Sequence, residues 1–338
     1  MELARPLSVP WYLDPQVYQR EREAIFQPSW IMVGYAHQVD DAGDYFTEDV
    51  AGWSIFVQRG RDGELRAFHN VCPHRAGPLF HPGDGCQANL VCRYHGWAFN
   101  ADGSLLKARD FGCEVDKTTL GLTSVRVETW RHFVFVCMSP DTPPLMEWLG
   151  EFPHWCEPHL FDEYRFHGRY SHPMNANWKT YGDNFLENYH VPLVHPGLAR
   201  DVNALAPTLI RTEDKRWNVQ MAPPKEGALT EGIYTYTWPN FSINVFPGGM
   251  CTERWLPRGI RSTELIMDYF FTADALDVDE IIKASEEIAD EDVLIVESVQ
   301  RNLEGGIYVP GVLSPKHEMG LADCHQMIRD SLPEFAFP

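Results

Sequence analysis

The sequence predicts an α+β protein in which a small antiparallel β domain precedes a larger domain built from an antiparallel sheet packed against helices. Between about residues 40 and 140, short β-rich runs alternate with turns that contain glycine and aspartate. The proline-rich stretch Ser139–Pro144 follows, and neither a helix nor a strand passes through it easily. Helical and strand-like segments share the rest of the 338 residues, a length that suits two domains.

Each predicted element follows from local composition. Residues 1–38 form a helical lead-in, where apolar residues such as Tyr18 and Ile25 recur among charges. The first domain, residues 39–140, has strand-like runs rich in β-branched and aromatic residues at Trp53–Gln58, Arg66–Val71, Asn89–Cys92, Val125–Glu128 and Phe133–Cys137. The second domain, residues 145–338, is expected to contain a helix around 176–190, strands at Ser242–Phe246 and Thr263–Thr272, and a long helix from about Val278 to Glu304.

The charge balance restricts the classes of partner. Asp and Glu number 48 against 28 Lys and Arg, a formal net charge of −20. An acidic chain disfavours nucleic acids and anionic membranes, because both carry dense negative charge. A basic electron-donor protein and a cationic substrate stay open, and so does a simple role in solubility. The first residues lack a signal-peptide pattern and no apolar run reaches spanning length, so we expect a soluble, cytoplasmic protein.

Two of the eight cysteines are accompanied by histidines at the spacing of metal ligands. Cys72 and His74 form a Cys-x-His pair, and Cys92 and His95 form a Cys-x2-His pair. Two thiolates and two imidazoles from two loops are the ligand set of a [2Fe–2S] cluster in which histidines hold one of the irons. The alternative is a structural zinc site, which also takes two cysteines and two histidines. Zinc hairpins more often use Cys-x2-Cys, so the spacing favours the cluster.

The segments CPHRAGPL and CRYHGWAFNADGSL resemble the two cluster loops of Rieske non-haem iron oxygenases, the aromatic-ring-hydroxylating dioxygenase family. High-potential respiratory Rieske proteins usually add a cysteine to each loop, whereas this sequence has Gly77 and Tyr94 there and is similar to the lower-potential oxygenase type. The resemblance implies a Rieske [2Fe–2S] domain followed by a helix-grip, START-like catalytic domain that holds a mononuclear Fe(II).

A second group of potential ligands follows the predicted boundary. Two histidines and one carboxylate make the facial triad of non-haem Fe(II) oxygenases and leave positions open for O2. Glu187 and His190 are three residues apart, so a helix would place them on one face. Pro192 would bend or break that helix and return His195 towards His190. Taken alone, either histidine is more simply interpreted as a core or surface residue.

Helical phase selects the third ligand. In the long helix, an apolar stripe at helical spacing contains Ile288, Ile295, Val299 and Leu303. Asp292 falls within this stripe, and a buried carboxylate is costly unless it is paired or bound to a metal. We therefore predict Asp292 as the third iron ligand; the alternative is a solvent-exposed aspartate near a bend.

The segments NWKTYGDNFLENYHVPLVHPGL and EDVLIVESVQRNLE resemble the mononuclear-iron segments of the same family. The resemblance implies that His190, His195 and Asp292 bind iron, and that Glu187 links a cluster histidine to an iron histidine. Many family members have Asp where Glu187 stands. The chain contains no G-x-G-x-x-G nucleotide-binding pattern, so a separate NAD(P)H-dependent reductase or ferredoxin is needed. The family also implies a homotrimer in which one subunit's cluster serves the next subunit's iron.

Substrate is inferred from the branch of the family. Segments such as NWK and WPNFSINVFPGG look closest to the branch acting on choline, betaine and carnitine-like compounds, which implies hydroxylation beside nitrogen, with N-demethylation able to follow. Aromatic rings suit such cations, and the predicted pocket residues are Trp238, Phe241, Phe246 and Trp255. Each is more simply a core residue of the sheet. The alternatives are an oxygenase acting on an aromatic acid, by ring hydroxylation or demethylation, and an electron-transfer protein without oxygenase activity.

Overall fold

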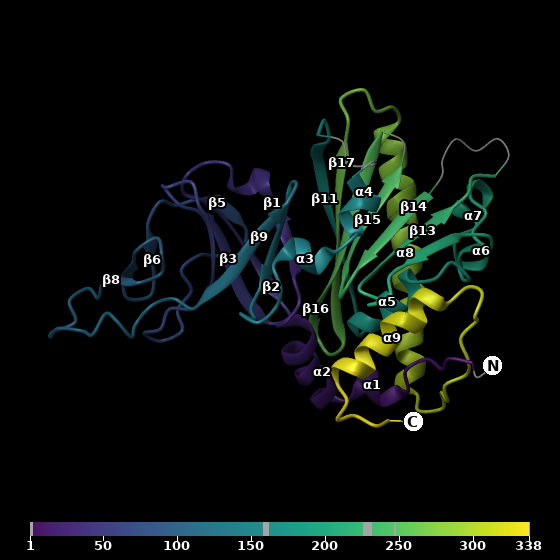
Figure 1. Ribbon diagram of the computed structural model, residues 1–338, viewed down its shortest axis with the longest axis horizontal. Helices are drawn as coiled ribbons and strands as arrows, with labels where there is room; N and C mark the ends of the chain where they lie inside the picture. The colour runs from purple at the N-terminus through teal and green to yellow at the C-terminus, as the bar shows by residue number, and fades with distance from the viewer. Residues whose placement is uncertain (1–2, 158–161, 226–231, 247, 338) are drawn as a thin grey trace. The chain divides into compact units, whose positions relative to one another are not determined.

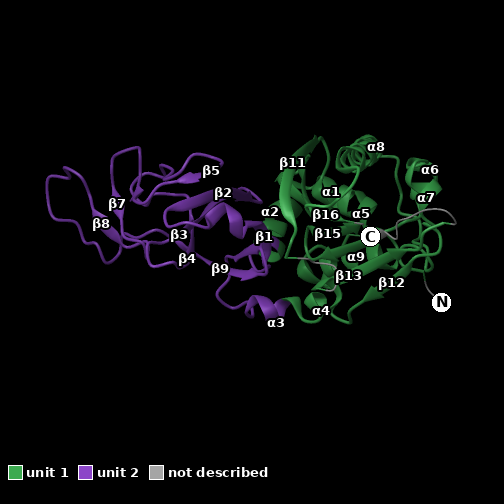
Figure 2. Cartoon of the chain, turned by 90° about the horizontal axis from the view of Figure 1, so that it is seen from above, with its two compact units in different colours: residues 1–25, 149–338 green, residues 26–148 purple. Residues whose placement is uncertain are grey.

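The computed structural model describes residues 3–157, 162–225, 232–246 and 248–337 (Figure 1). The chain divides into two compact units (Figure 2). The smaller unit is residues 26–148, and the larger unit combines residues 1–25 with residues 149–338. The N-terminal helices therefore belong with the C-terminal half of the chain. The fold class predicted from sequence, a small antiparallel β domain and a larger α+β domain, is confirmed.

Every residue of the smaller unit is described, and its core is a seven-stranded antiparallel sheet in the order β1-β10-β9-β4-β3-β2-β5. A separate three-stranded sheet, β6-β7-β8, carries one of the two cysteine loops. The strands are β1 (Ile31–Tyr35), β2 (Asp44–Val50), β3 (Trp53–Arg59), β4 (Leu65–His69), β5 (Asp84–Cys86), β6 (Leu90–Val91), β7 (Ala98–Phe99), β8 (Leu105–Lys107), β9 (Ser124–Trp130) and β10 (Phe133–Cys137). The five strand-like runs predicted for this region correspond to β3, β4, β6, β9 and β10.

The boundary between the units lies earlier than the sequence-based boundary at residue 38. Strand β1 falls inside the predicted helical lead-in and pairs antiparallel with β10, from Ile31 opposite Val136 to Tyr35 opposite Phe133. All five of its residues are buried, which suits a strand in the core of a sheet. The helical prediction holds only upstream, for α1 (Val9–Leu13), α2 (Pro15–Glu21) and the π-helical turn Arg22–Phe26. A 3₁₀ helix, Ala36–Val39, follows β1, and α3 (Leu145–Leu149) lies at the second boundary.

In the smaller unit, the loop after β4 is fixed by one buried amide. Asn70 accepts hydrogen bonds from the backbone amides of Leu79 (2.8 Å) and Phe80 (3.1 Å) and donates one to the Phe80 carbonyl (2.9 Å). The loop between these residues carries Cys72 and returns into an aromatic core. Cys72 and Cys92 are part of that core. The packing therefore positions both thiols.

The larger unit contains a seven-stranded antiparallel sheet in the order β11-β17-β16-β15-β14-β13-β12, counted over the described residues. Its strands are β11 (Arg165–Met174), β12 (Thr208–Arg211), β13 (Trp217–Ala222), β14 (Gly232–Thr237), β15 (Phe241–Phe246), β16 (Gly249–Gly259) and β17 (Ser262–Phe271). Its further helices are α4 (Phe152–Cys156), α5 (Trp178–Phe185), α6 (Val191–Val194), α7 (Leu198–Asp201), α8 (Val278–Glu304) and α9 (Met319–Ser331).

Helices α5 and α8 pack on each other, α5 also on β16 and α8 also on β11 (Figure 1). The long helix was predicted with the bounds that α8 has, and the two predicted strands correspond to β15 and β17. No helix within the described ranges is both long enough and apolar enough to cross a bilayer.

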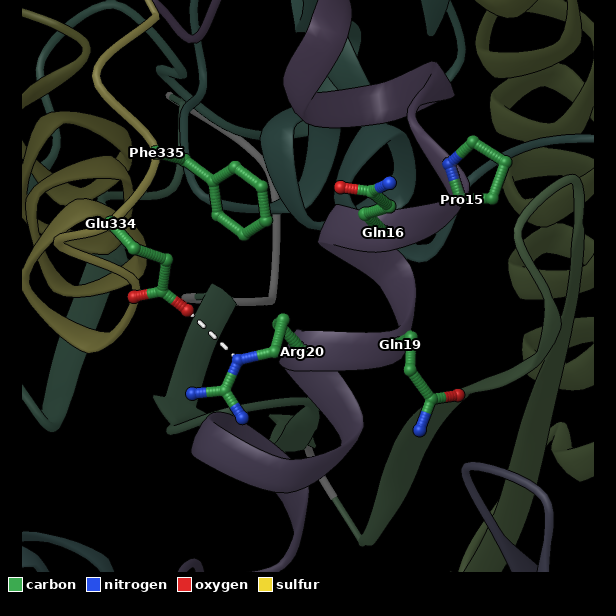
Figure 3. Close-up of a pocket in the computed structure, with 6 residues that line it drawn as sticks. All are labelled: Pro15, Gln16, Gln19, Arg20, Glu334 and Phe335. Carbon is green, nitrogen blue, oxygen red and sulfur yellow. Dashed lines mark hydrogen bonds and ion pairs between the residues drawn. The ribbon is translucent and has the colours of Figure 1, made fainter.

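A buried ion pair attaches the N-terminal segment to α5. The ammonium of Lys179 donates to the carboxylate of Glu21, which also accepts a 2.9 Å hydrogen bond from the Trp178 indole. Both charged side chains have no exposed surface. Burial raises the pKa of Glu21 and lowers that of Lys179, while their mutual attraction opposes both shifts. At the surface, Arg20 of α2 meets Glu334 near the C-terminus at 2.8 Å (Figure 3).

The Lys179–Glu21 pair gives a stability prediction. Lys179→Met leaves the carboxylate of Glu21 buried without a counter-charge, so we expect the free energy of unfolding to fall by about 3–5 kcal/mol in urea titrations followed by tryptophan fluorescence. Lys283→Met is the matched control, because Lys283 and its partner Glu287 are both exposed and 3.9 Å apart. The control should change stability by less than about 0.5 kcal/mol. Equal effects of the two substitutions would contradict the assignment.

Candidate cluster and metal sites

The two cysteine loops of the smaller unit fold in the same way. In each loop the cysteine amide donates to the carbonyl five residues on, and the cysteine carbonyl accepts from the amide four residues on; these bonds, 2.8–2.9 Å long, join Cys72 to Gly77 and Ala76, and Cys92 to Trp97 and Gly96. The residue at the fourth position has a left-handed backbone in both loops, with φ 55° at Ala76 and 73° at Gly96. Each loop therefore turns back on itself and directs its thiol inwards.

The four predicted cluster ligands are brought together by these loops. Cys72 and Cys92 are each 1% exposed, whereas His74 and His95 are only partly buried. Burial and the neighbouring Cys92 thiol raise the pKa of Cys72 to about 11. Burial and the nearby charges of His74 and Arg75 lower the pKa of His95. The histidine rings lie 4.6 Å apart between centroids, and both Nδ1 atoms are buried without a hydrogen-bond partner.

This donor set fits a [2Fe–2S] cluster. A buried thiol with a raised pKa beside a second buried thiol, and two buried ring nitrogens without hydrogen-bond partners, are groups that a cationic centre stabilises. A single metal ion requires three or more donor atoms close together. Among the described residues, the four cysteine and histidine side chains do not include three donor atoms that all lie within 4.8 Å of one another. The wider spacing suits a cluster with two irons better than one zinc ion.

Close packing between the loops explains one glycine of the motif. A Cβ atom on Gly77 would lie 2.9 Å from the Cβ of Tyr94 and 3.0 Å from the Sγ of Cys92, so a larger residue does not fit there. Gly77 and Tyr94, the two residues that stand in place of the respiratory cysteines, are thus direct neighbours. Trp97 stacks on the His74 ring at 4.7 Å, with 10° between the planes.

In the larger unit, His190, His195 and Asp292 converge as predicted. One donor atom from each lies within 4.8 Å of the others. The Nε2 atom of His195 is 2.9 Å from Oδ1 of Asp292, and Nε2 of His190 is 3.8 Å from the same oxygen. His195 is 2% exposed and Asp292 is 8% exposed. These residues form the one group of possible single-ion ligands within the described ranges.

Carboxylates hold the far side of both histidines. His190 Nδ1 is 2.5 Å from Oε1 of Glu187, and His195 Nδ1 is 2.7 Å from Oε2 of Glu291. With Nδ1 occupied, each ring presents Nε2 towards Asp292, the arrangement that orients histidine ligands in metal sites. Burial alone would lower the pKa of His195, but Asp292 and Glu291 together raise it. Two imidazoles and one carboxylate that point to a common centre are the ligand set of a mononuclear Fe(II) site.

The segment that carries these histidines differs from the predicted helix over 176–190. Helix α5 ends at Phe185, and Glu187 and His190 lie in the bend that follows. The predicted helical face is therefore wrong, and the side chain of Glu187 reaches His190 across the bend instead. The helix is interrupted and His195 returns towards His190, as predicted, but the interruption comes before Pro192. Pro192 occupies the first turn of α6, where its missing N–H costs nothing, and His190 and His195 flank this short helix.

Asp292 lies on the buried face of α8, but its predicted neighbours are only partly right. Ile295 is 37% exposed and Val299 is 42% exposed. The face that is buried carries Ile282, Ala289, Asp292, Val296, Gln300 and Leu303. Apolar residues along a helix do not by themselves identify which side faces the core, because the chain also leaves apolar side chains at the surface.

Two residues at this site were not predicted. Glu291, the residue before Asp292 on α8, contacts Nδ1 of His195. Asn184 donates from Nδ2 to Oδ1 of Asp292 and so fixes the carboxylate from α5. The sequence did offer a signal for each residue: Glu291 directly precedes Asp292, and Asn184 is three residues before Glu187.

The four aromatic residues predicted for a substrate pocket do not form one cluster. Trp255, on β16, faces α5, and its ring lies 5.5 Å from Tyr181 and 5.3 Å from Phe185. Phe241 pairs with Arg254, the residue before Trp255, so it points to the opposite face of the sheet. The other two lie elsewhere on the sheet: Phe246 ends β15 against Phe271, and Trp238 is buried at the turn between β14 and β15.

Comparison with known proteins supports both sites. The family model of the ring hydroxylating alpha subunit (catalytic domain) matches residues 161–334, and that of the Rieske [2Fe–2S] domain matches residues 29–126. The chain is similar to the chloroplastic choline monooxygenase of Beta vulgaris, with 32% identity over 95% of this chain and 76% of that one. The carnitine monooxygenase oxygenase subunit of Escherichia coli K12 is 33% identical over 94% of this chain and 91% of its own length.

The fold is similar to a solved quaternary ammonium Rieske monooxygenase in complex with L-carnitine. The TM-score is 0.87 at 30% identity, and the match covers 97% of this chain and 96% of that chain. The Rieske match favours a [2Fe–2S] cluster over a zinc ion in the smaller unit. The cofactors are therefore a Rieske [2Fe–2S] cluster and a mononuclear iron.

The two sites should lose their metals independently. We expect His190→Ala to remove the mononuclear iron while the visible absorption of the cluster stays, because the two ligand sets share no residue. Cys72→Ser should abolish the cluster absorption and leave iron in the larger unit. Iron and sulfide analysis with visible spectra measures both, and Cys86→Ser, at an exposed cysteine, is the control. Loss of the cluster in the His190 variant would contradict the assignment.

The contact between Glu291 and His195 gives a second metal prediction. Glu291→Gln removes the charge that holds His195 Nδ1, so we expect iron affinity to fall by about 10–100-fold, as measured by titration with a competing chelator. Glu287→Gln, on the exposed side of the same helix, is the control and should bind iron as the wild type does. Equal affinities for the two variants would remove Glu291 from the site.

Proposed function

This chain belongs to the ring-hydroxylating alpha subunits that carry a Rieske [2Fe–2S] domain, and we propose that it is a terminal oxygenase for small quaternary ammonium compounds. The reaction is hydroxylation of a C–H bond beside the nitrogen with O2, and N-demethylation can follow. The observation that carries the proposal is the convergence of His190, His195 and Asp292 in a chain similar to choline and carnitine monooxygenases along nearly its whole length.

The residues divide the work between the two units. When bound, the cluster supplies electrons one at a time and the mononuclear iron supplies the site of oxygen activation. Cys72 and Cys92, which are buried in the apolar core, would hold one side of the cluster, and His74 and His95, which lie nearer the surface, would hold the other. In the larger unit, Glu187 and Glu291 orient the histidine rings, and Asn184 holds the Asp292 carboxylate.

Electrons have to come from another protein. Hydroxylation with O2 consumes two electrons beyond those of the substrate, and the chain has no G-x-G-x-x-G pattern for a nicotinamide cofactor. A separate NAD(P)H-dependent reductase or ferredoxin is therefore part of the proposal. The cytoplasmic location expected from the sequence stays a prediction.

Assembly as a homotrimer is also proposed. A solved quaternary ammonium Rieske monooxygenase that is similar to this chain is described in terms of inter-subunit electron transfer. Within this chain, Glu187 is bonded to the iron-site histidine His190 and keeps partial exposure. We propose that Glu187 of one subunit links His190 to a cluster histidine of the next subunit.

Turnover with defined substrates tests the function. With a reductase supplying electrons, we expect oxygen uptake matched by hydroxylated or dealkylated product from at least one of choline, L-carnitine and γ-butyrobetaine. His190→Ala should make no product while its cluster is still reduced. Product from aromatic acids alone would replace this proposal with an aromatic-acid oxygenase. Full activity in the His190 variant would exclude the assigned iron site.

A further inference from the structure

One buried acid of the larger unit is not used by either metal site. Glu253 lies on β16 and is 6% exposed. One carboxylate oxygen accepts a hydrogen bond from the Tyr181 hydroxyl (2.6 Å) and the other accepts one from the Asn244 amide (2.5 Å). Both partners are neutral. Within the described residues, no lysine or arginine is paired with Glu253.

This absence of a counter-charge distinguishes Glu253 from two other deeply buried acids. Glu21 is paired with Lys179, and Asp268 is paired with Arg254 and Arg169. A carboxylate buried without a cation is costly. Burial, with a contribution from the charge of Asp292, raises the pKa of Glu253 to about 7, although Tyr181 and Asn244 act in the opposite direction. A positively charged ligand would remove this cost.

Strand register places Glu253 on the face of the sheet that α5 and α8 cover. It stands opposite Ser242 and Met267 on the neighbouring strands, and all three point to the same face. Trp255, two residues on, shares this face and contacts α5 through Tyr181. Several buried polar atoms on this face have no hydrogen-bond partner, namely Ser242 Oγ, Asn244 Oδ1 and Trp255 Nε1.

Helix α5 connects Glu253 to the iron site. Tyr181 donates to Glu253, and Asn184, three residues later on the same face of the helix, donates to Asp292. Neighbouring side chains of one helix therefore hold the buried acid and the iron ligand.

We propose that Glu253 is a specificity-determining residue whose carboxylate is the counter-charge for the ammonium group of the substrate. The inference rests on the proposed function and adds the residue that selects for positive charge. Each oxygen of Glu253 accepts one hydrogen bond from a neutral group, so the negative charge of the carboxylate stays without a matching positive charge among the described residues. A quaternary ammonium has no N–H to donate and binds through charge and aromatic faces, which Tyr181 and Trp255 supply beside it.

Glu253→Gln tests the role of charge, because glutamine keeps the shape and can still accept from Tyr181. The probes are choline and its neutral carbon isostere 3,3-dimethyl-1-butanol, with tetramethylammonium binding followed by calorimetry. We expect KM for choline to rise by about 10–100-fold and the preference for choline over the isostere to fall by the same factor. Iron content and the cluster spectrum should be unchanged. Glu253→Asp, which keeps the charge, should retain the preference, and Glu287→Gln controls for net charge.

The outcomes separate this inference from the proposed function. An unchanged preference in Glu253→Gln, or an equal loss with both probes, would overturn the role of Glu253 while choline turnover by the wild type keeps the function. If the wild type turns over no quaternary ammonium but binds tetramethylammonium, and the Gln variant binds it at least about tenfold more weakly, the inference stands and the function fails. A wild type that neither turns over nor binds these cations overturns both. If Glu253→Gln loses its iron, Glu253→Asp becomes the test, because it keeps the negative charge. Loss of the preference for choline in Glu253→Asp would then count against the inference.

Discussion

A carboxylate holds the Nδ1 atom of each iron-site histidine, and much of the larger unit serves to keep these two contacts in place. Glu187 reaches His190 within one bend of the chain, whereas Glu291 reaches His195 from α8. The contact between His195 and Glu291 requires α6 and α8 to keep their positions relative to each other. Packing of α5 on α8 and on the sheet holds α8 in place, so the mononuclear site depends on the face of the sheet that these helices cover.

In the smaller unit, two loops of the same backbone structure position the predicted cluster ligands. Its two cysteine loops make the same pair of backbone hydrogen bonds and use the same left-handed residue, which directs both thiols into one apolar core. Backbone bonds within each loop fix its shape, so the ligand spacing is a local property. The histidines stay nearer the surface, where an electron can enter or leave without a path through the core.

The buried charges of the larger unit fall into two groups. The Lys179–Glu21 pair and the contacts of Asp268 are balanced within the chain. The iron ligand Asp292 and the acid Glu253 are not balanced by lysine or arginine among the described residues, and both lie beside α5. The first is completed by a metal. We propose that Glu253 is balanced by a cationic substrate. Helix α5 therefore contacts both of these acids, one for each ligand.

The sequence by itself predicted the candidate ligand sets: short spacing indicated Cys72 with His74, Cys92 with His95, and His190 with His195. Helical phase indicated Asp292, although Ile295 and Val299 of the same predicted stripe are exposed. The sequence also determined the two-domain α+β class. Only the tertiary structure decided that the N-terminal helices join the larger unit, that α5 ends at Phe185, and that Phe241 and Trp255 face opposite ways. The supporting residues were out of reach for the same reason: Glu291, Asn184 and Glu253 meet partners 96, 108 and 72 residues away. Such contacts depend on how helices pack on a sheet, which local patterns do not specify.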